Sequence, residues 1–326
     1  MIDVENLTKH FGVTRAVDDI SFAIGKGEVV GFLGPNGAGK TTTIRILTCF
    51  HPATSGSARV NGYDVFKQAV EVRRSVGYLA ENVPLYPDLR VEEFLMYRAA
   101  LKGVVRRERK NAVGSAMERC GVVEVRRKLV GHVSRGYRQR VGLADSLVAS
   151  PTILVLDEPT SGLDPNQRRK VKDLVRELAV DHTILFSSHI LAEVEDVSSR
   201  VIVIDRGKIK ADGSPRELLE QSQGRQLVVC AAATAEDLAA CLGDITGARE
   251  VTVEISDEGF STLRCILDPG ADPRDEAFAR LSQRGIRIRE LKLNMPTLEE
   301  FFAELTRDPS LAAEDGADRA PEEVTV

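Results

Sequence analysis

The 326-residue sequence contains no apolar run of the roughly 18–20 residues that a membrane-spanning helix requires. Its first ten residues, MIDVENLTKH, include two acidic side chains within the first five positions and no apolar run, unlike a signal peptide. We therefore expect a soluble, cytoplasmic chain. A role at the membrane would place it peripherally at the cytoplasmic face, through a partner.

The sequence also lacks a basic excess. The formal net charge is −5, and the segment 308–326 accounts for all of it with one base, Arg319, and six acids: Asp308, Glu314, Asp315, Asp318, Glu322 and Glu323. Residues 1–307 are therefore formally neutral. Nucleic-acid-binding proteins normally carry a clear basic excess, so we expect no nucleic-acid partner. We predict that the acidic tail, residues 307–326, is disordered.

The sequence also lacks a paired-cysteine motif. None of the five cysteines belongs to a C-x-x-C pair or has a histidine at metal-ligand spacing: Cys49, Cys120, Cys230, Cys241 and Cys265. An odd, dispersed set is typical of reduced cytosolic thiols. The apolar content of 43% is enough for a substantial core. A chain of this length commonly forms one large domain and a smaller one.

Short apolar runs alternate with helical patterns in the first two thirds of the sequence. The clearest runs are Val29–Leu33, Ile153–Leu156, Thr183–Phe186 and Val201–Ile204. Continuous apolar strands separated by helices indicate an α/β fold whose parallel sheet is covered on both faces. More polar strand candidates, with turn signals at 61–62 and 206–207, predict a small antiparallel layer.

Helical patterns fill the region from about residue 86 to 150, including Val91–Leu101 and Arg107–Cys120. We interpret this region as a helical insertion into the α/β core of a first domain that spans residues 1–222.

A second unit is expected over residues 223–306. Its pattern is β-α-β-β-α-β, the order of a ferredoxin-like α+β domain, followed by a last helix at Leu298–Leu305. We find no catalytic or metal-binding constellation in it. Packing, dimer support, ligand sensing and partner selection all remain open as its role.

A phosphate-binding loop is predicted at Gly34–Thr41, GPNGAGKT, which matches G-x-x-x-x-G-K-[ST]. The motif follows an apolar strand and precedes a helical pattern, as this loop requires; an accidental glycine-rich turn is the alternative. Backbone N–H groups converge on phosphate in such loops, Lys40 adds positive charge, and the Thr41 hydroxyl can bind magnesium. The candidate nucleotide-binding residues are Gly34, Pro35, Asn36, Gly37, Ala38, Gly39, Lys40, Thr41 and Thr42.

The sequence ILVLDE at 153–158 places two carboxylates at the end of a predicted parallel strand, where ligands of α/β sheets bind. Asp157 suits a metal ion, directly or through its water. Glu158 can polarise an attacking water as a general base.

Together these motifs resemble the nucleotide-binding subunits of ABC transporters, and the resemblance covers residues 1 to about 216. It implies ATP and Mg²⁺ as cofactors, integral membrane permease subunits as partners, and a homodimer or a heterodimer with a related ATPase. His189 resembles the histidine that contacts the γ-phosphate, and Phe11 the aromatic residue that stacks on adenine. The sequence SGLD resembles the dimer-contact loop of the family: Ser161, Gly162, Leu163 and Asp164.

The stretch VSRGYRQR at 133–140 resembles the family signature LSGGQ-x-QR. It is either a charged helix start or an anion site, because a helix N-terminus presents a hydroxyl and free N–H groups. In the family the anion is the γ-phosphate of ATP held by the opposite subunit, and the signature residues are Ser134, Arg135, Gly136 and Gln139. Val133, Arg135 and Tyr137 depart from the pattern, and the departures resemble a subgroup with a basic residue and tyrosine here.

Glu81 stands where the family usually has a glutamine that senses magnesium and the attacking water; a glutamate can still bind the ion. The following Pro84–Pro87 is either a rigid loop or the surface that meets the permease. The basic runs 106–110 and 126–128 are interpreted as solvated faces, with contact to a membrane surface or nucleic acid as the alternative.

The leading hypothesis is an ATPase subunit that powers a transporter. The resemblance of the second unit to domains of type 2 ABC exporters favours export. The alternatives are a soluble ABC ATPase acting in translation or DNA repair and a regulatory module that does not hydrolyse ATP. A soluble ABC ATPase of that kind usually has two ATPase units in one chain or a long coiled coil. The regulatory module is disfavoured by the retained Lys40, Asp157, Glu158 and His189.

Overall fold

The computed structural model describes residues 1–221, 225–255, 259–268, 270–294, 300–302 and 305. It divides into two compact units, Met1–Ser214 and Pro215–Val326, and each is described by itself. Half of the predicted helix Leu298–Leu305 (298, 299, 303 and 304) falls outside the described residues, and the acidic tail 307–326 does so completely. Among the described residues, no helix has the length and apolar character that crossing a membrane demands.

A six-stranded sheet forms the centre of the first unit, in the order β10-β9-β3-β8-β7-β6. Its strands are β3 (Val29–Leu33), β6 (Val76–Leu79), β7 (Ile153–Asp157), β8 (Thr183–Ser188), β9 (Arg200–Asp205) and β10 (Lys208–Gly213). All neighbours are parallel except β9 and β10. Strands β3, β7 and β8 are buried at every position, as strands covered on both faces must be. The predicted α/β class is confirmed.

A second, four-stranded sheet in the order β2-β1-β4-β5 is the expected antiparallel layer. It comprises β1 (Ile2–Phe11), β2 (Thr14–Ile24), β4 (Ser55–Val60) and β5 (Tyr63–Asp64). Its apolar face packs with α1 (Lys40–Leu47) and with one face of the main sheet in a single core. Asn61 and Gly62, at the predicted turn between β4 and β5, have φ angles of 54° and 83°. Arg206 and Gly207 also have positive φ, so both turn signals mark real hairpins.

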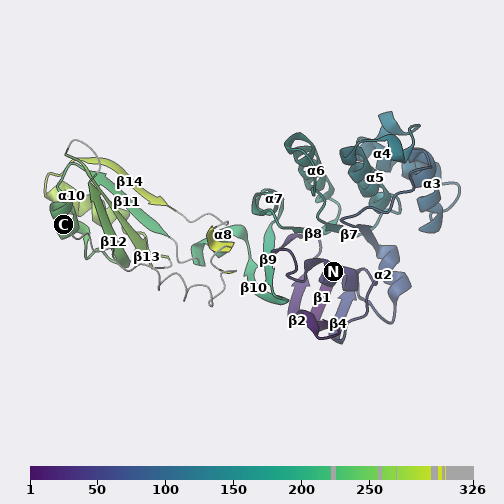
Figure 1. The fold of residues 1–326 in the computed structure, drawn as a ribbon, viewed down its shortest axis with the longest axis horizontal. Helices are drawn as coiled ribbons and strands as arrows, with labels where there is room; N and C mark the ends of the chain where they lie inside the picture. Colours follow the sequence, from purple (N-terminus) through teal and green to yellow (C-terminus); the bar gives the residue numbers. More distant parts are fainter. Residues whose placement is uncertain (222–224, 256–258, 269, 295–299, 303–304, 306–326) are drawn as a thin grey trace, which may run out of the picture. The chain divides into compact units, whose positions relative to one another are not determined.

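The opposite face of the main sheet is covered by α6 (Pro165–Leu178) and α7 (Leu191–Val197), as Figure 1 shows. Helix α7 approaches β3 closely at Gly31, where an added Cβ would lie 2.1 Å from Cγ1 of Val194. Only a glycine allows this contact. It keeps the segment after β8 close to the strand that leads into the phosphate loop.

The region 86–150 is helical, with α3 (Val91–Leu101), α4 (Arg109–Arg119), α5 (Arg135–Leu147) and two short 3-10 helices, Val123–Val125 and Val130–His132. Helix α2 (Ala69–Ser75) precedes β6. Helix α5 begins at Arg135, directly after Ser134, which caps it by accepting a hydrogen bond from the Tyr137 N–H.

The second unit begins with α8 (Pro215–Gln221) and continues as β11 (Gln226–Ala231), α9 (Ala235–Leu242), β12 (Ala248–Ile255), β13 (Ser261–Leu267), α10 (Arg274–Gln283) and β14 (Ile288–Asn294). From β11 onward the element order is β-α-β-β-α-β, and the antiparallel sheet has the order β12-β13-β11-β14. One face packs on α9 and α10 around an apolar core that includes Leu227, Leu238 and Leu281. The assignment of this unit as ferredoxin-like remains a prediction.

Candidate nucleotide-binding site

Four parallel strands end at the same edge of the main sheet, and each is followed by a candidate site residue. Strand β3 leads into Gly34, β6 into Glu81, β7 into Glu158 and β8 into His189. Because the carboxyl ends of parallel strands meet at one edge, segments far apart in the sequence form one site.

The phosphate loop requires glycine at two places. A Cβ at Gly34 would lie 2.3 Å from the carbonyl oxygen of Ile204, so the loop can pass this close to β9 only without a side chain. Gly39, which precedes α1, has φ of 109°, a conformation that other residues rarely adopt. The loop therefore turns sharply and directs the N-terminus of α1 toward the site.

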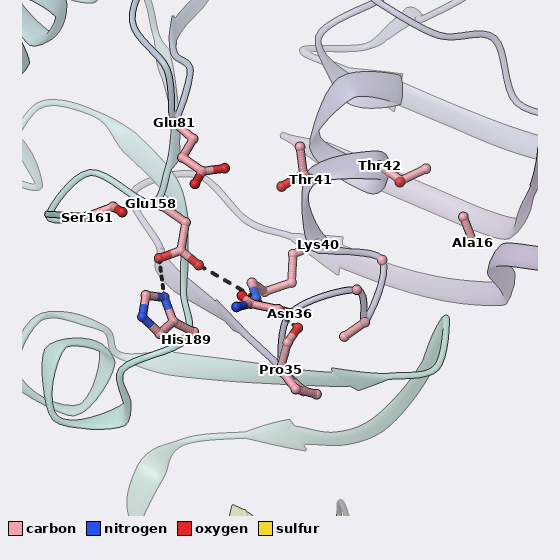
Figure 2. Close-up of a pocket in the computed structure, with 13 residues that line it drawn as sticks. Ala16, Pro35, Asn36, Lys40, Thr41, Thr42, Glu81, Glu158, Ser161 and His189 are labelled. Atoms are coloured by element: carbon pink, nitrogen blue, oxygen red, sulfur yellow. Dashed lines mark hydrogen bonds and ion pairs between the residues drawn. The ribbon is translucent and has the colours of Figure 1, made fainter.

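A cavity of about 420 Å³ lies over this loop. The lining residues are Ala16, Pro35, Asn36, Gly37, Ala38, Gly39, Lys40, Thr41, Thr42, Glu81, Glu158, Ser161 and His189 (Figure 2). Most of the sequence candidates are therefore brought together. Gly34 and Asp157 are not among the lining residues, but each is adjacent to one that is.

Lys40 is buried, with 6% of its surface exposed. Its Nζ donates to the carbonyl oxygens of Gly34 at 2.6 Å and Pro35 at 3.1 Å, and it lies 3.6 Å from Oε1 of Glu158. Burial lowers the pKa of Lys40, while the negative charge of Glu158 opposes that shift. The ammonium group is thus held by the loop itself, at the point where a phosphate would arrive.

Glu158 is held between a cation and a histidine. Its Oε2 lies 2.7 Å from Nδ1 of His189, and its backbone N–H donates to Oγ of Ser187 at 3.0 Å. Glu158 has φ of 49°, which is uncommon for a residue other than glycine. Figure 2 shows the carboxylate directed between His189 and Lys40.

Asp157 forms the buried floor of the site. Its Oδ1 accepts hydrogen bonds from Ser187 at 2.7 Å and from Thr41 at 3.3 Å. Burial raises the pKa of Asp157, and the nearby negative charges of Glu81 and Glu158 add to that effect. A buried carboxylate beside a hydroxyl is a donor set that suits a hard cation, which would also offset the charge.

Phe11 does not line the cavity; its ring is 46% exposed and meets the ring of His51 edge-on at 5.6 Å. Ala16, on the neighbouring strand β2, lines the cavity instead. Sequence reasoning missed Ala16 because a small apolar residue in a strand carries no chemical signal.

The signature residues lie on the helix predicted for them, apart from the cavity. Ser134 is exposed and caps α5, Gly136 is buried under the side chain of Gln167, and Gln139 is 7% exposed. Within the described part of the chain, Nε2 of Gln139 is buried without a hydrogen-bond partner. None of the signature residues lines the cavity of its own chain.

The predicted dimer-contact loop contacts both the cavity and the signature segment. Ser161 lines the cavity, Leu163 is buried, and Asp164 caps α6 by accepting from the N–H of Gln167 at 2.9 Å. The guanidinium group of Arg135 packs on Gly162, since a Cβ there would lie 2.1 Å from Cζ of Arg135. The arginine that departs from the signature pattern therefore contacts this loop.

Comparison with known proteins agrees with these observations. The ABC transporter family pattern matches residues 17–161. The daunorubicin resistance ATP-binding protein DrrA3 of Streptomyces coeruleorubidus is 34% identical over 313 residues, which cover 94% of this chain and 96% of that protein. The bacitracin transport ATP-binding protein BcrA of Bacillus licheniformis is 39% identical over 211 residues, covering 64% and 68%.

Solved structures share the fold of the first unit. The structure of cbiO1 from Clostridium perfringens, described as part of the ABC transporter complex cbiONQ, aligns with a TM-score of 0.62 at 28% identity. The alignment covers 67% of this chain and 89% of that one. One relative matches along nearly its whole length, and the phosphate loop lies in the structural context that its motif requires. The chain therefore belongs to the ATP-binding proteins of ABC transporters and is an ATPase.

Proposed function

We propose that two copies of this chain, or one copy and a related ATPase, close around two ATP molecules and thereby drive export through separate permease subunits. The observation that carries this proposal is the separation of the signature from the cavity. Since Ser134 and Gly136 do not line the cavity of their own chain, they are available to complete the site of a partner. One chain carries one phosphate loop and one signature, so two complete sites require two subunits.

The signature favours an anion because it opens a helix. The hydroxyl of Ser134 and the first N–H groups of α5 lie where the helix dipole is positive. Charge-assisted hydrogen bonds from these groups to a γ-phosphate would stabilise the closed dimer. Gln167 now covers Gly136 and would have to move for that contact, which its half-buried, unbranched side chain can do by changing rotamer.

Hydrolysis is assigned to three side chains. Glu158 orients the attacking water and accepts its proton, and His189 fixes the carboxylate through the contact at Nδ1. Lys40 exchanges its contact with Glu158 for the β- and γ-phosphates and stabilises the charge of the transferred phosphoryl group. Loss of the shared γ-phosphate then removes the contacts that hold the dimer closed.

Magnesium is proposed as the metal because of the donor set. Thr41, Asp157 and Glu81 supply oxygen atoms only, and in the described residues no group of three or more His, Cys, Asp and Glu is arranged to hold a metal. Magnesium suits such a site, since it usually keeps several waters and binds through one or two carboxylates and substrate phosphates. When bound, it would neutralise charge on the phosphate oxygens.

The permease contact is proposed at Pro84–Pro87 and the adjoining face of α3. Tyr86 and Tyr97 are 47% and 46% exposed, and their rings meet at 5.9 Å. Exposed aromatic side chains beside a proline-rich loop are suited to bind a partner. This contact would hold the ATPase at the cytoplasmic face of a membrane, since no described helix can span one.

Export is favoured over a soluble mechanical role by the relatives, which are named for drug resistance and for bacitracin transport. Phe11 is proposed to stack on adenine from the rim of the site. The second unit is proposed to support packing or dimer formation.

The test is to solubilise membranes in detergent, purify the tagged chain and identify what accompanies it by mass spectrometry. We expect an integral membrane protein at matched stoichiometry. Ribosomes or DNA in place of a membrane protein would favour the soluble mechanical role and contradict the proposal. The Lys40→Ala variant serves as the control for nucleotide-dependent partners.

A further inference from the structure

Glu193 is a buried carboxylate outside the motifs described above. It lies in the first turn of α7 and is 6% exposed. Its Oε2 accepts hydrogen bonds from Oγ1 of Thr160 at 2.5 Å and from Oγ of Ser188 at 3.0 Å. Among the described residues, Oε1 has no hydrogen-bond partner. A carboxylate in this position needs a reason, because burying one is unfavourable unless its contacts compensate.

The two hydroxyl donors belong to two different functional segments. Thr160 lies two residues after Glu158 and directly before the dimer-contact loop, which begins at Ser161. Ser188 directly precedes His189 at the end of β8. The carboxylate of Glu193 therefore connects the segment that carries the proposed base to the segment that carries the histidine.

These contacts close a ring. His189 meets Glu158 at 2.7 Å on the cavity side, and Glu193 joins Thr160 to Ser188 on the buried side. The small hollow that Glu193 shares with Thr160 is lined mainly by apolar side chains, including Val171 and Phe186, and also by Lys172. Hydrogen bonds to a charged group in such low-dielectric surroundings are strong and fix geometry.

We propose that Glu193 is a positioning residue that fixes the spacing between the dimer-contact loop and His189. It touches neither the cavity lining nor the phosphate loop. Its loss is therefore expected to loosen the alignment of Glu158 with His189 while leaving ATP binding to the single subunit intact. The inference rests on the roles of Glu158 and His189 given under Proposed function.

The test compares steady-state ATP hydrolysis and fluorescent-nucleotide affinity for a set of variants. For Glu193→Ala and Thr160→Val we expect kcat to fall about tenfold while the KM for ATP stays within about twofold. Glu193→Gln, which keeps an acceptor oxygen, and Thr160→Ser, which keeps the hydroxyl, should each recover most of the loss. Glu195→Gln is the matched control, because this exposed carboxylate lies two residues further along the same helix.

The pair is also tested for coupling. Because each single variant already removes the hydrogen bond between Thr160 and Glu193, the double variant Glu193→Ala with Thr160→Val should lose no more than about twofold beyond the worse single variant. Additive losses would overturn the proposal, as would a kcat for Glu193→Ala within about twofold of the parent. If Glu193→Ala fails to bind nucleotide, the turnover of Thr160→Val is compared with that of Thr160→Ser. Equal turnover of these two variants would overturn the proposal.

Glu158→Gln is measured in parallel, so that the two hypotheses fail separately. Normal turnover of Glu158→Gln would refute the proposed base, whatever the Glu193 variants do. If Glu158→Gln blocks turnover and Glu193→Ala does not alter it, only the positioning role is wrong.

Discussion

The carboxylate of Glu158 contacts His189 through one oxygen and faces Lys40 with the other. The distances are 2.7 Å from Oε2 to Nδ1 of His189 and 3.6 Å from Oε1 to Nζ of Lys40. In this arrangement the proposed base partly neutralises Lys40, the lysine proposed to bind phosphate. An arriving phosphate can replace the carboxylate at Lys40, which would leave Glu158 held by His189 alone and free to bind water.

The His189→Ala variant tests this arrangement. We expect kcat to fall about 100-fold, because both the orientation of Glu158 and a contact to the γ-phosphate are lost. ATP affinity should change only a few-fold, since the phosphate loop is intact. Steady-state kinetics and a fluorescent-nucleotide titration measure the two effects. A kcat above one third of the parent value would contradict the assignment.

The Arg135→Gly variant tests the departure from the signature. The guanidinium group packs on Gly162, so it does not cover the hydroxyl and N–H groups at the start of α5. We therefore expect the variant to keep ATPase activity. The adjacent Gly136→Ala is the contrasting variant, because it adds a methyl group at the proposed phosphate contact, where a Cβ would lie 2.2 Å from Oε1 of Gln167. A more than tenfold loss of turnover in Arg135→Gly would contradict this reading.

A partly buried ion cluster joins α3 to α5. Asp145 accepts from Nε and Nη2 of Arg98, both at 2.9 Å, and Nζ of Lys102 lies 3.1 Å from Oδ1. Asp145→Ala would leave two cations without this partner. We therefore expect the free energy of unfolding, measured by urea titration, to fall by about 2–3 kcal/mol. Asp173→Ala, which breaks an exposed pair with Arg176, should have a much smaller effect. Equal losses in the two variants would refute the structural role of the cluster.

Tyr78 makes stability depend on alkaline pH. Burial, with the nearby charge of Asp157, raises the pKa of its phenol from 10.0 to about 12. The folded state therefore keeps a proton that the unfolded state loses, so the free energy of unfolding should fall as pH rises from 10 to 12. Tyr78→Phe should reduce that fall and remove a tyrosine that ionises near pH 12 in an ultraviolet titration. Loss of a phenol that ionises near pH 10 instead would show that Tyr78 is solvated.

The sequence predicts the buried parallel strands closely because continuous apolar runs leave few alternatives. Val29–Leu33 has the same limits in the structure. Strand β6 was not predicted, since Val76–Leu79 is a short edge strand that contains a glycine and is only partly buried. The start of α5 was predictable because a serine cap, Ser134, marks it in the sequence.

The site was predictable where one motif carries its chemistry in consecutive residues, as in the phosphate loop. It was not predictable where tertiary packing decides. Ala16 reaches the cavity only because β2 passes beside the loop. Glu193 has no local signal, and its two partners, Thr160 and Ser188, are distant in sequence from each other.

The central claim is that ATP joins two subunits. Small-angle scattering of the Glu158→Gln variant, saturated with ATP and magnesium, tests it most directly. The variant should bind nucleotide, hydrolyse it very slowly and scatter with about twice the mass of the 35.6 kDa chain, while nucleotide-free protein scatters as single chains. Single chains at saturating ATP would contradict the account.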